Sequence, residues 1–138
     1  MSIFDGLRGQ NKITLDSKSA VLLSCILMVS ADGSVDDDEM AIIRRIDGSG
    51  STNSWDAAVK AYNKLDRSAA FDLACESLSR DHLMPLMANL IDIAMADGEL
   101  AGDEKRLLEK FLLKLQPDVG EITSMVDVIS VKNSIRTI

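Results

Sequence analysis

The tripeptide Ala-Asp-Gly occurs twice in this 138-residue chain, each time between an apolar segment and an amphipathic one. Residues 31–39 align with residues 96–104 at an offset of 65, and five positions are identical: the Ala-Asp-Gly that opens each segment and the Asp-Glu that closes it. Asp-Gly is a helix-stop signal, because glycine just past a helix end accepts the left-handed conformation. The repeat therefore predicts two pseudo-equivalent halves, each made of a helix, a tight acidic turn and a second helix.

The rest of the chain also favours helices. Leu, Ala, Ile and Met dominate the apolar residues, aromatic residues make up 4%, and there are only two prolines. We predict an all-α fold, a single compact bundle of about seven helices, in which residues 1–15 form an N-terminal arm and residues 16–138 one helical domain. Apolar spacing and capping residues place the helices at about 16–31, 37–46, 55–65, 68–78, 81–96, 103–115 and 118–131. The predicted caps are Ser54, then Asp66 or Ser68, and Asp81.

The segment Ala20–Val29 is apolar on nearly every side. Such a run suggests either a buried central helix or the hydrophobic region of a signal peptide. The preceding segment carries Asp5 and Asp16 beside its basic residues, and an equivalent apolar helix recurs at 86–96, where it cannot be a signal. The run is also about half the length that a membrane span requires. We therefore interpret it as the core of the bundle, without a signal peptide or a membrane span.

The acids of the two turns admit two interpretations. In the first, they only end and restart helices: Asp36 and Glu39 have the spacing of a capping box, and acids in a first turn suit the helix dipole. In the second, they bind a divalent cation, because hard cations such as Ca²⁺ and Mg²⁺ take several oxygen ligands. Acids crowd both turns beyond the needs of capping, and the second copy replaces the capping Asp36 with Ala101 yet retains its Asp-Glu pair. Both interpretations stay open here.

Several function classes find no support in the sequence. The net charge of −7 argues against nucleic acid as a partner, because phosphate contacts need a Lys/Arg surface. His82 is the only histidine, and neither nucleotide-binding glycine motifs nor Cys/His zinc spacings occur. Cys25 and Cys75 lie in apolar helical context, so we expect them to be small core residues in a reducing compartment.

An apolar helix, Ala-Asp-Gly, a short spacer, Asp-Glu and an amphipathic helix, twice over within residues 16–131, resemble the tellurite-resistance TerB-like family. The resemblance implies a seven-helix bundle, located in the cytoplasm or at the inner face of the membrane, in a tellurite and chemical-stress resistance system. It also implies a divalent-metal site, which maps here onto Asp32, Asp38, Glu39, Asp97, Asp103 and Glu104. Asp92 has no counterpart in the first half, where Leu27 stands, and is a less certain member of the set.

We therefore expect a non-enzymatic module that binds a divalent metal ion (Ca²⁺, Mg²⁺ or another) and contacts a protein partner, which could itself be membrane-associated. One alternative is a protein-interaction scaffold whose acids are only helix caps. Another is a hydrolase that uses Asp97 or Glu104 as a base.

Overall fold

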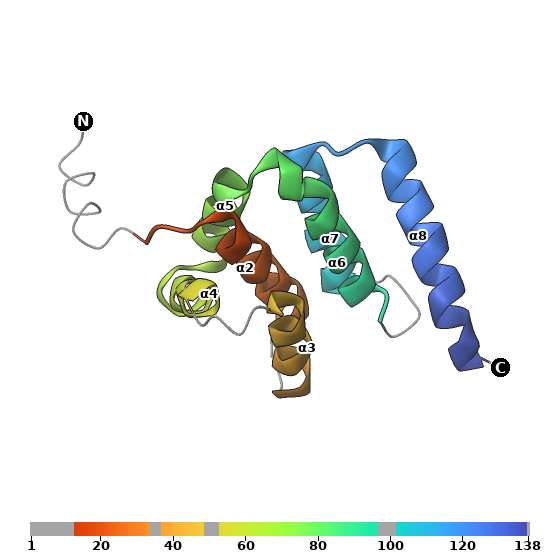
Figure 1. The fold of residues 1–138 in the computed structure, drawn as a ribbon, viewed down its shortest axis with the longest axis horizontal. Coiled ribbons are helices and arrows are strands. Elements are labelled where there is room, and N and C mark those ends of the chain that lie inside the picture. The colour runs from red at the N-terminus through yellow and green to blue at the C-terminus, as the bar shows by residue number, and fades with distance from the viewer. Residues whose placement is uncertain (1–12, 34–36, 49–52, 97–101, 138) are drawn as a thin grey trace.

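Seven α-helices and two short 3₁₀ helices follow one another along the residues that the computed structural model describes, which are 13–33, 37–48, 53–96 and 102–137 (Figure 1). No strand occurs in these residues. The all-α prediction and the predicted helix count are confirmed. The elements are α2 (Ser17–Val29), α3 (Asp37–Asp47), α4 (Asn53–Lys64), α5 (Arg67–Ser77), η1 (Arg80–His82), α6 (Leu83–Ala94), α7 (Gly102–Leu115), α8 (Val119–Asn133) and η2 (Ser134–Thr137).

Helix α2 is the central element of the bundle. Ten of its thirteen residues are buried, and it packs against α3, α4, α5, α6 and α7. A helix that is apolar all round can be buried on every side, which is why this segment occupies the middle rather than an edge. The prediction that Ala20–Val29 belongs to the core is confirmed. No described helix combines the length and the apolar character needed to cross a membrane.

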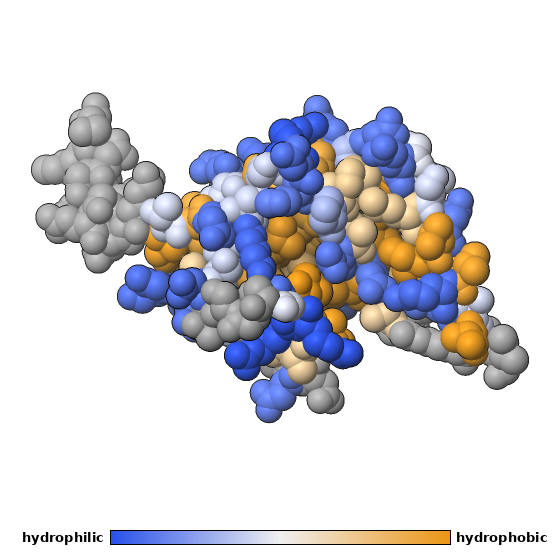
Figure 2. Space-filling model, viewed as in Figure 1, coloured by the Kyte–Doolittle hydropathy of each residue, from blue (hydrophilic) through white to orange (hydrophobic). Residues whose placement is uncertain are grey.

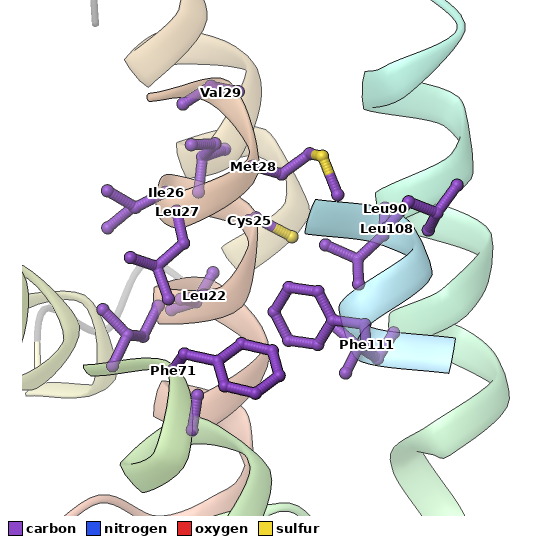
Figure 3. Packing of buried hydrophobic residues seen from close by; sticks show 14 of the residues in the cluster. Leu22, Cys25, Ile26, Leu27, Met28, Val29, Phe71, Leu90, Leu108 and Phe111 are labelled. Atoms are coloured by element: carbon purple, nitrogen blue, oxygen red, sulfur yellow. The ribbon is translucent and has the colours of Figure 1, made fainter. Parts of the chain in front are cut away.

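The core is formed where α2 meets α5, α6 and α7 (Figure 3). The rings of Phe71 on α5 and Phe111 on α7 pack with centroids 4.7 Å apart at an interplanar angle of 57°, a tilted arrangement that suits the ring quadrupoles. Met28 extends from α2 toward Leu90 on α6 (Figure 3). These contacts place the ends of α2 and α6, and hence the acidic turns that follow them, in one bundle.

Capping explains most helix starts, and it also corrects two predictions. Asp66 caps α5, as predicted, by accepting the N–H of Ala69 at 2.7 Å. Ser54 is not a cap, because α4 begins at Asn53, and the Ser54 hydroxyl instead donates to Oδ2 of Asp16 at 3.3 Å. Asp81 lies within η1, whose cap is Ser79, and α6 starts only at Leu83. The sequence predicted the starts of α4 and α6 to within a few residues. The Ser54 side chain contacts Asp16 instead of capping α4, and Asp81 lies in the 3₁₀ turn that precedes α6.

Asp16 offers a test of capping. Its Oδ1 accepts the N–H of Ser19 at 2.7 Å, and this bond, with smaller help from Ser54 and Lys18, holds the pKa of the carboxyl below its ordinary 3.8. Asp16→Ala is expected to lower the free energy of unfolding at neutral pH by about 1 kcal/mol. Because the folded pKa is depressed, this contribution is present above pH 3.8 and declines as the pH falls below it. Urea unfolding across that range measures the difference. Asp16→Asn, which keeps a cap without the charge, should lose less at neutral pH.

Candidate acidic site

The two acidic turns begin alike in the structure. After α2, the N–H of Ser30 donates to the carbonyl oxygen of Ile26 at 3.0 Å and the N–H of Ala31 donates to that of Met28 at 3.3 Å. After α6, the N–H of Met95 donates to the carbonyl oxygen of Ile91 at 2.9 Å and the N–H of Ala96 donates to that of Ile93 at 3.2 Å, the equivalent positions 65 residues later. The next helices, α3 and α7, also begin 65 residues apart. The repeat is therefore structural at the helix ends, whereas the pseudo-symmetry of the complete halves stays a prediction.

Gly33 carries the turn that follows α2. Its φ of 105° lies in the left-handed region that favours glycine, and its N–H donates to the carbonyl oxygen of Ser30 at 2.9 Å. This conformation turns the chain away from the axis of α2 and leaves Asp32 exposed at the helix end. The helix-stop interpretation of Asp-Gly is confirmed in the first turn, while Gly98 of the second turn lies outside the described residues.

Acids of both repeats line a single pocket of about 780 Å³, which we call the acidic pocket. It lies where the ends of α2, α3, α6, α7 and α8 meet. Its carboxylates come from Asp32, Glu39, Asp92 and Glu104, and its cationic groups from Arg45 and Lys132. The apolar part of its wall consists of Val29, Ile42, Ile46, Ile93 and Ala96.

Three of the six predicted ligands, Asp32, Glu39 and Glu104, therefore come together. Asp103 does not line this pocket but another one. Its Oδ1 forms an ion pair at 2.9 Å with Nη1 of Arg106, one turn later in α7. Asp97 and the side chain of Asp38 lie outside the described residues, as does the Asp36 cap.

Lys132 is a pocket residue that the sequence alone did not indicate. Its Nζ lies 2.5 Å from Oδ1 of Asp92, across the contact between α8 and α6. The two residues are 40 positions apart, so no local pattern relates them. Together with Arg45, Lys132 offsets part of the negative charge, and the described residues of the pocket wall carry four carboxylates and two cationic groups. The remaining excess of carboxylates suits a cation.

The acidic pocket offers ligand atoms of the type that a hard divalent ion prefers, but its described carboxylates are not close together. The pocket supplies carboxylate oxygens and neither histidine nor cysteine, which is the ligand type that Ca²⁺ and Mg²⁺ prefer. Among the described side chains, however, no three Asp, Glu, His or Cys residues lie close enough together to hold a metal ion. Asp32, Glu39 and Glu104 are the predicted ligands that line the pocket, while Asp97 and the Asp38 side chain lie outside the described residues.

The only histidine serves a different part of the fold. Nδ1 of His82 lies 2.6 Å from Oγ of Ser17, and the same Oγ accepts the N–H of Ser79 at 2.8 Å. This exposed hydrogen-bonded link ties the start of α2 to η1. His82 is not among the residues lining the acidic pocket.

The cysteines carry no thiolate chemistry at neutral pH. Cys25 is fully buried in the core, and burial raises the pKa of its thiol to about 12. Cys75 is half-buried against the core, and burial raises its pKa to about 11. Both are free. A thiol becomes a nucleophile or a metal ligand as the thiolate, so these positions contribute to packing at neutral pH.

Comparison with known proteins relates the chain to a described family. No curated protein and no solved structure matched the chain. A family described as "Tellurite resistance protein TerB" matches residues 18–119, a segment that runs from the first turn of α2 to the start of α8 and contains both acidic turns. The match covers most of the chain, which therefore belongs to the TerB tellurite resistance family.

Proposed function

We propose that this protein is a non-enzymatic module of a tellurite and chemical-stress resistance system. In this proposal it binds a divalent metal ion in the acidic pocket and contacts a protein partner through the surface that the ion orders. One observation carries the metal site: carboxylates from both copies of the repeat, Asp32 and Glu39 from the first and Glu104 from the second, line the same pocket.

The energetic case rests on charge. Carboxylates gathered on one wall repel one another, and a cation between them relieves the repulsion. Arg45 and Lys132 offset part of the negative charge of these carboxylates, and Lys132 forms an ion pair with Asp92. A divalent ion would join the start of α3 to the start of α7 through Glu39 and Glu104. Asp38 and Asp97 remain proposed ligands on the strength of the sequence repeat.

Thermal melting of chelator-treated protein with added Ca²⁺, Mg²⁺ or Mn²⁺ tests the site. An ion that binds only the folded state raises stability by about 2.7 kcal/mol when its concentration is one hundred times Kd. We expect Tm to rise with one of these ions and the rise to disappear in the double variant D32N/E104Q.

The matched control is D56N/E76Q, which removes the same two charges at exposed positions on α4 and α5 outside the pocket. This control should keep the full rise in Tm. Equal losses in both double variants would mean that the ions act by general screening. No rise at millimolar ion would contradict the site and favour the scaffold alternative, in which the acids only cap helices and form ion pairs such as Asp103–Arg106.

The proposed partner contact draws support from α8. Val128 and Val131 of α8 are 67% and 73% exposed, and their spacing of three residues places them on one side of the helix. Ile135, on η2 directly after α8, is 71% exposed. Figure 2 shows apolar surface over α8 in the view of Figure 1. A partner with an apolar contact surface would cover these side chains. We propose that the module acts in the cytoplasm, where a membrane-associated partner would bring it to the inner face of the membrane.

A further inference from the structure

A second pocket, of about 420 Å³, lies between the end of α2, the start of α5 and α7. We call it the basic pocket, because the charged side chains among its described lining residues are Arg67, Arg106 and Lys110 together with Asp103. The remaining lining residues are Leu27, Ala31, Ser68, Phe71 and Leu107. In a chain with a net charge of −7, three cationic side chains around one hollow are a local reversal of charge. Such a reversal favours an anionic ligand.

Arg67 is held in place by the helix end beside it. Its Nη1 donates to the carbonyl oxygen of Ser30 at 2.8 Å and lies 3.1 Å from the Ser30 hydroxyl. Its Cζ also lies 5.5 Å from the centroid of the Tyr62 ring. Both hydrogen bonds use Nη1, so they leave the other N–H groups of the guanidinium for a ligand. A guanidinium already oriented by the protein loses little conformational freedom when it binds an anion.

Lys110 and Arg106 lie one turn apart on α7 and complete the rim. Nζ of Lys110 lies 4.4 Å from the centroid of the Phe71 ring, which holds the ammonium above the apolar floor. Arg106 pairs with Asp103, but their side chains are 77% and 53% exposed. An exposed ion pair of this kind is weak because solvent screens it, so an anion can recruit Arg106 at small cost.

The floor of the pocket is apolar and belongs to the core. Phe71 and Leu27 are 3% and 2% exposed, and both are labelled in the packing view of Figure 3. Leu107 and Ala31 extend this apolar surface toward the rim. A ligand that fits the pocket therefore combines a charged head for the rim with a small apolar group for the floor.

We propose that the basic pocket binds a small phosphate monoester that carries an apolar group. Three cations against one carboxylate match the double negative charge of a phosphate head, and arginine presents its N–H groups in a geometry that suits phosphate oxygens. The apolar group of the ester would pack on Leu107 above the floor formed by Phe71 and Leu27. This inference is independent of the metal site, because the two pockets share no lining residue.

Isothermal titration of the full chain with phenyl phosphate, inorganic phosphate and phenol tests the proposal. We expect phenyl phosphate to bind most tightly, since it alone uses both the rim and the floor. R106Q/K110Q should weaken that binding by about tenfold or more, because a hydrogen bond to a charged group contributes more than 1.4 kcal/mol. Both residues are exposed on α7, so the variant should stay folded.

The control K60Q/K64Q removes two positive charges from exposed positions of α4 outside the pocket and should leave the affinity unchanged. Equal losses in the two double variants would show that the anion responds only to overall charge. Absence of phenyl phosphate binding would overturn the proposal. Equal affinities for phenyl phosphate and inorganic phosphate would show that the apolar floor does not contribute to binding. Equal affinities for phenyl phosphate and phenol would show that the cationic rim does not contribute.

Discussion

Ile26→Asp is expected to abolish cooperative folding. Ile26 is 1% exposed near the C-terminal end of α2, the helix that contacts five others. A carboxylate there has no partner, and burying an unpaired charge or its protonated form costs several kcal/mol. A domain of this size is stable by about 5–15 kcal/mol in total, so the loss consumes most of that stability. We expect the variant to lack a cooperative thermal transition in circular dichroism.

Two further variants test whether the burial of the charge causes the loss of folding in Ile26→Asp. Ile26→Val keeps the site apolar and should lower the free energy of unfolding by about 0.5–1.5 kcal/mol. Val128→Asp introduces the same charge at a position that is 67% exposed on α8, and its melting curve should stay close to that of the parent. A sharp melting transition in Ile26→Asp would contradict the central position of α2.

Phe111→Ala is expected to lower the free energy of unfolding by about 3–5 kcal/mol. The Phe111 side chain is fully buried, and its ring packs against Phe71 with centroids 4.7 Å apart. Truncation leaves a cavity between α7 and α5 and removes the ring contact, which contributes about 1 kcal/mol beyond burial. Urea unfolding monitored by circular dichroism gives the difference.

Leu113→Ala is the matched control for this prediction. Leu113 lies two residues later in α7 and is 77% exposed, so its truncation should change stability by less than about 0.5 kcal/mol. Comparable losses in both variants would contradict the assignment of the loss to the buried contacts of Phe111, because alanine has the highest helix propensity and does not weaken α7 through the backbone in either variant.

The fold could be predicted because its determinants are local. The apolar run Ala20–Val29 has no polar side, so only a central position buries it fully. Asp-Gly and the capping acids then mark where helices end and begin. The predictions of Ser54 and Asp81 as caps were wrong. Ser54 hydrogen-bonds Asp16, which is distant in the sequence, and Asp81 lies in a 3₁₀ turn before α6.

The candidate site could be predicted only in part, and helix geometry explains why. Consecutive helical residues point about 100° apart, because a turn contains 3.6 residues. The Asp-Glu pair that opens α7 therefore divides: Glu104 faces the acidic pocket while Asp103 faces the basic pocket. The repeat indicates which acids recur, but not which of two neighbours shares a side with Asp32. Lys132 could not be predicted at all, since only the packing of α8 on α6 brings it to Asp92.

The attachment of α8 has a consequence for the order in which the protein opens. Only two of its fifteen residues, Ile129 and Asn133, are buried, against ten of thirteen in α2. Two polar contacts join the end of α8 to the end of α6: Lys132 forms an ion pair with Asp92, and Nδ2 of Asn133 donates to the carbonyl oxygen of Met95, the C-cap residue of α6, at 3.0 Å. Amide hydrogens along α8 should therefore exchange with solvent through local opening, well before those of α2, whose exposure requires global unfolding.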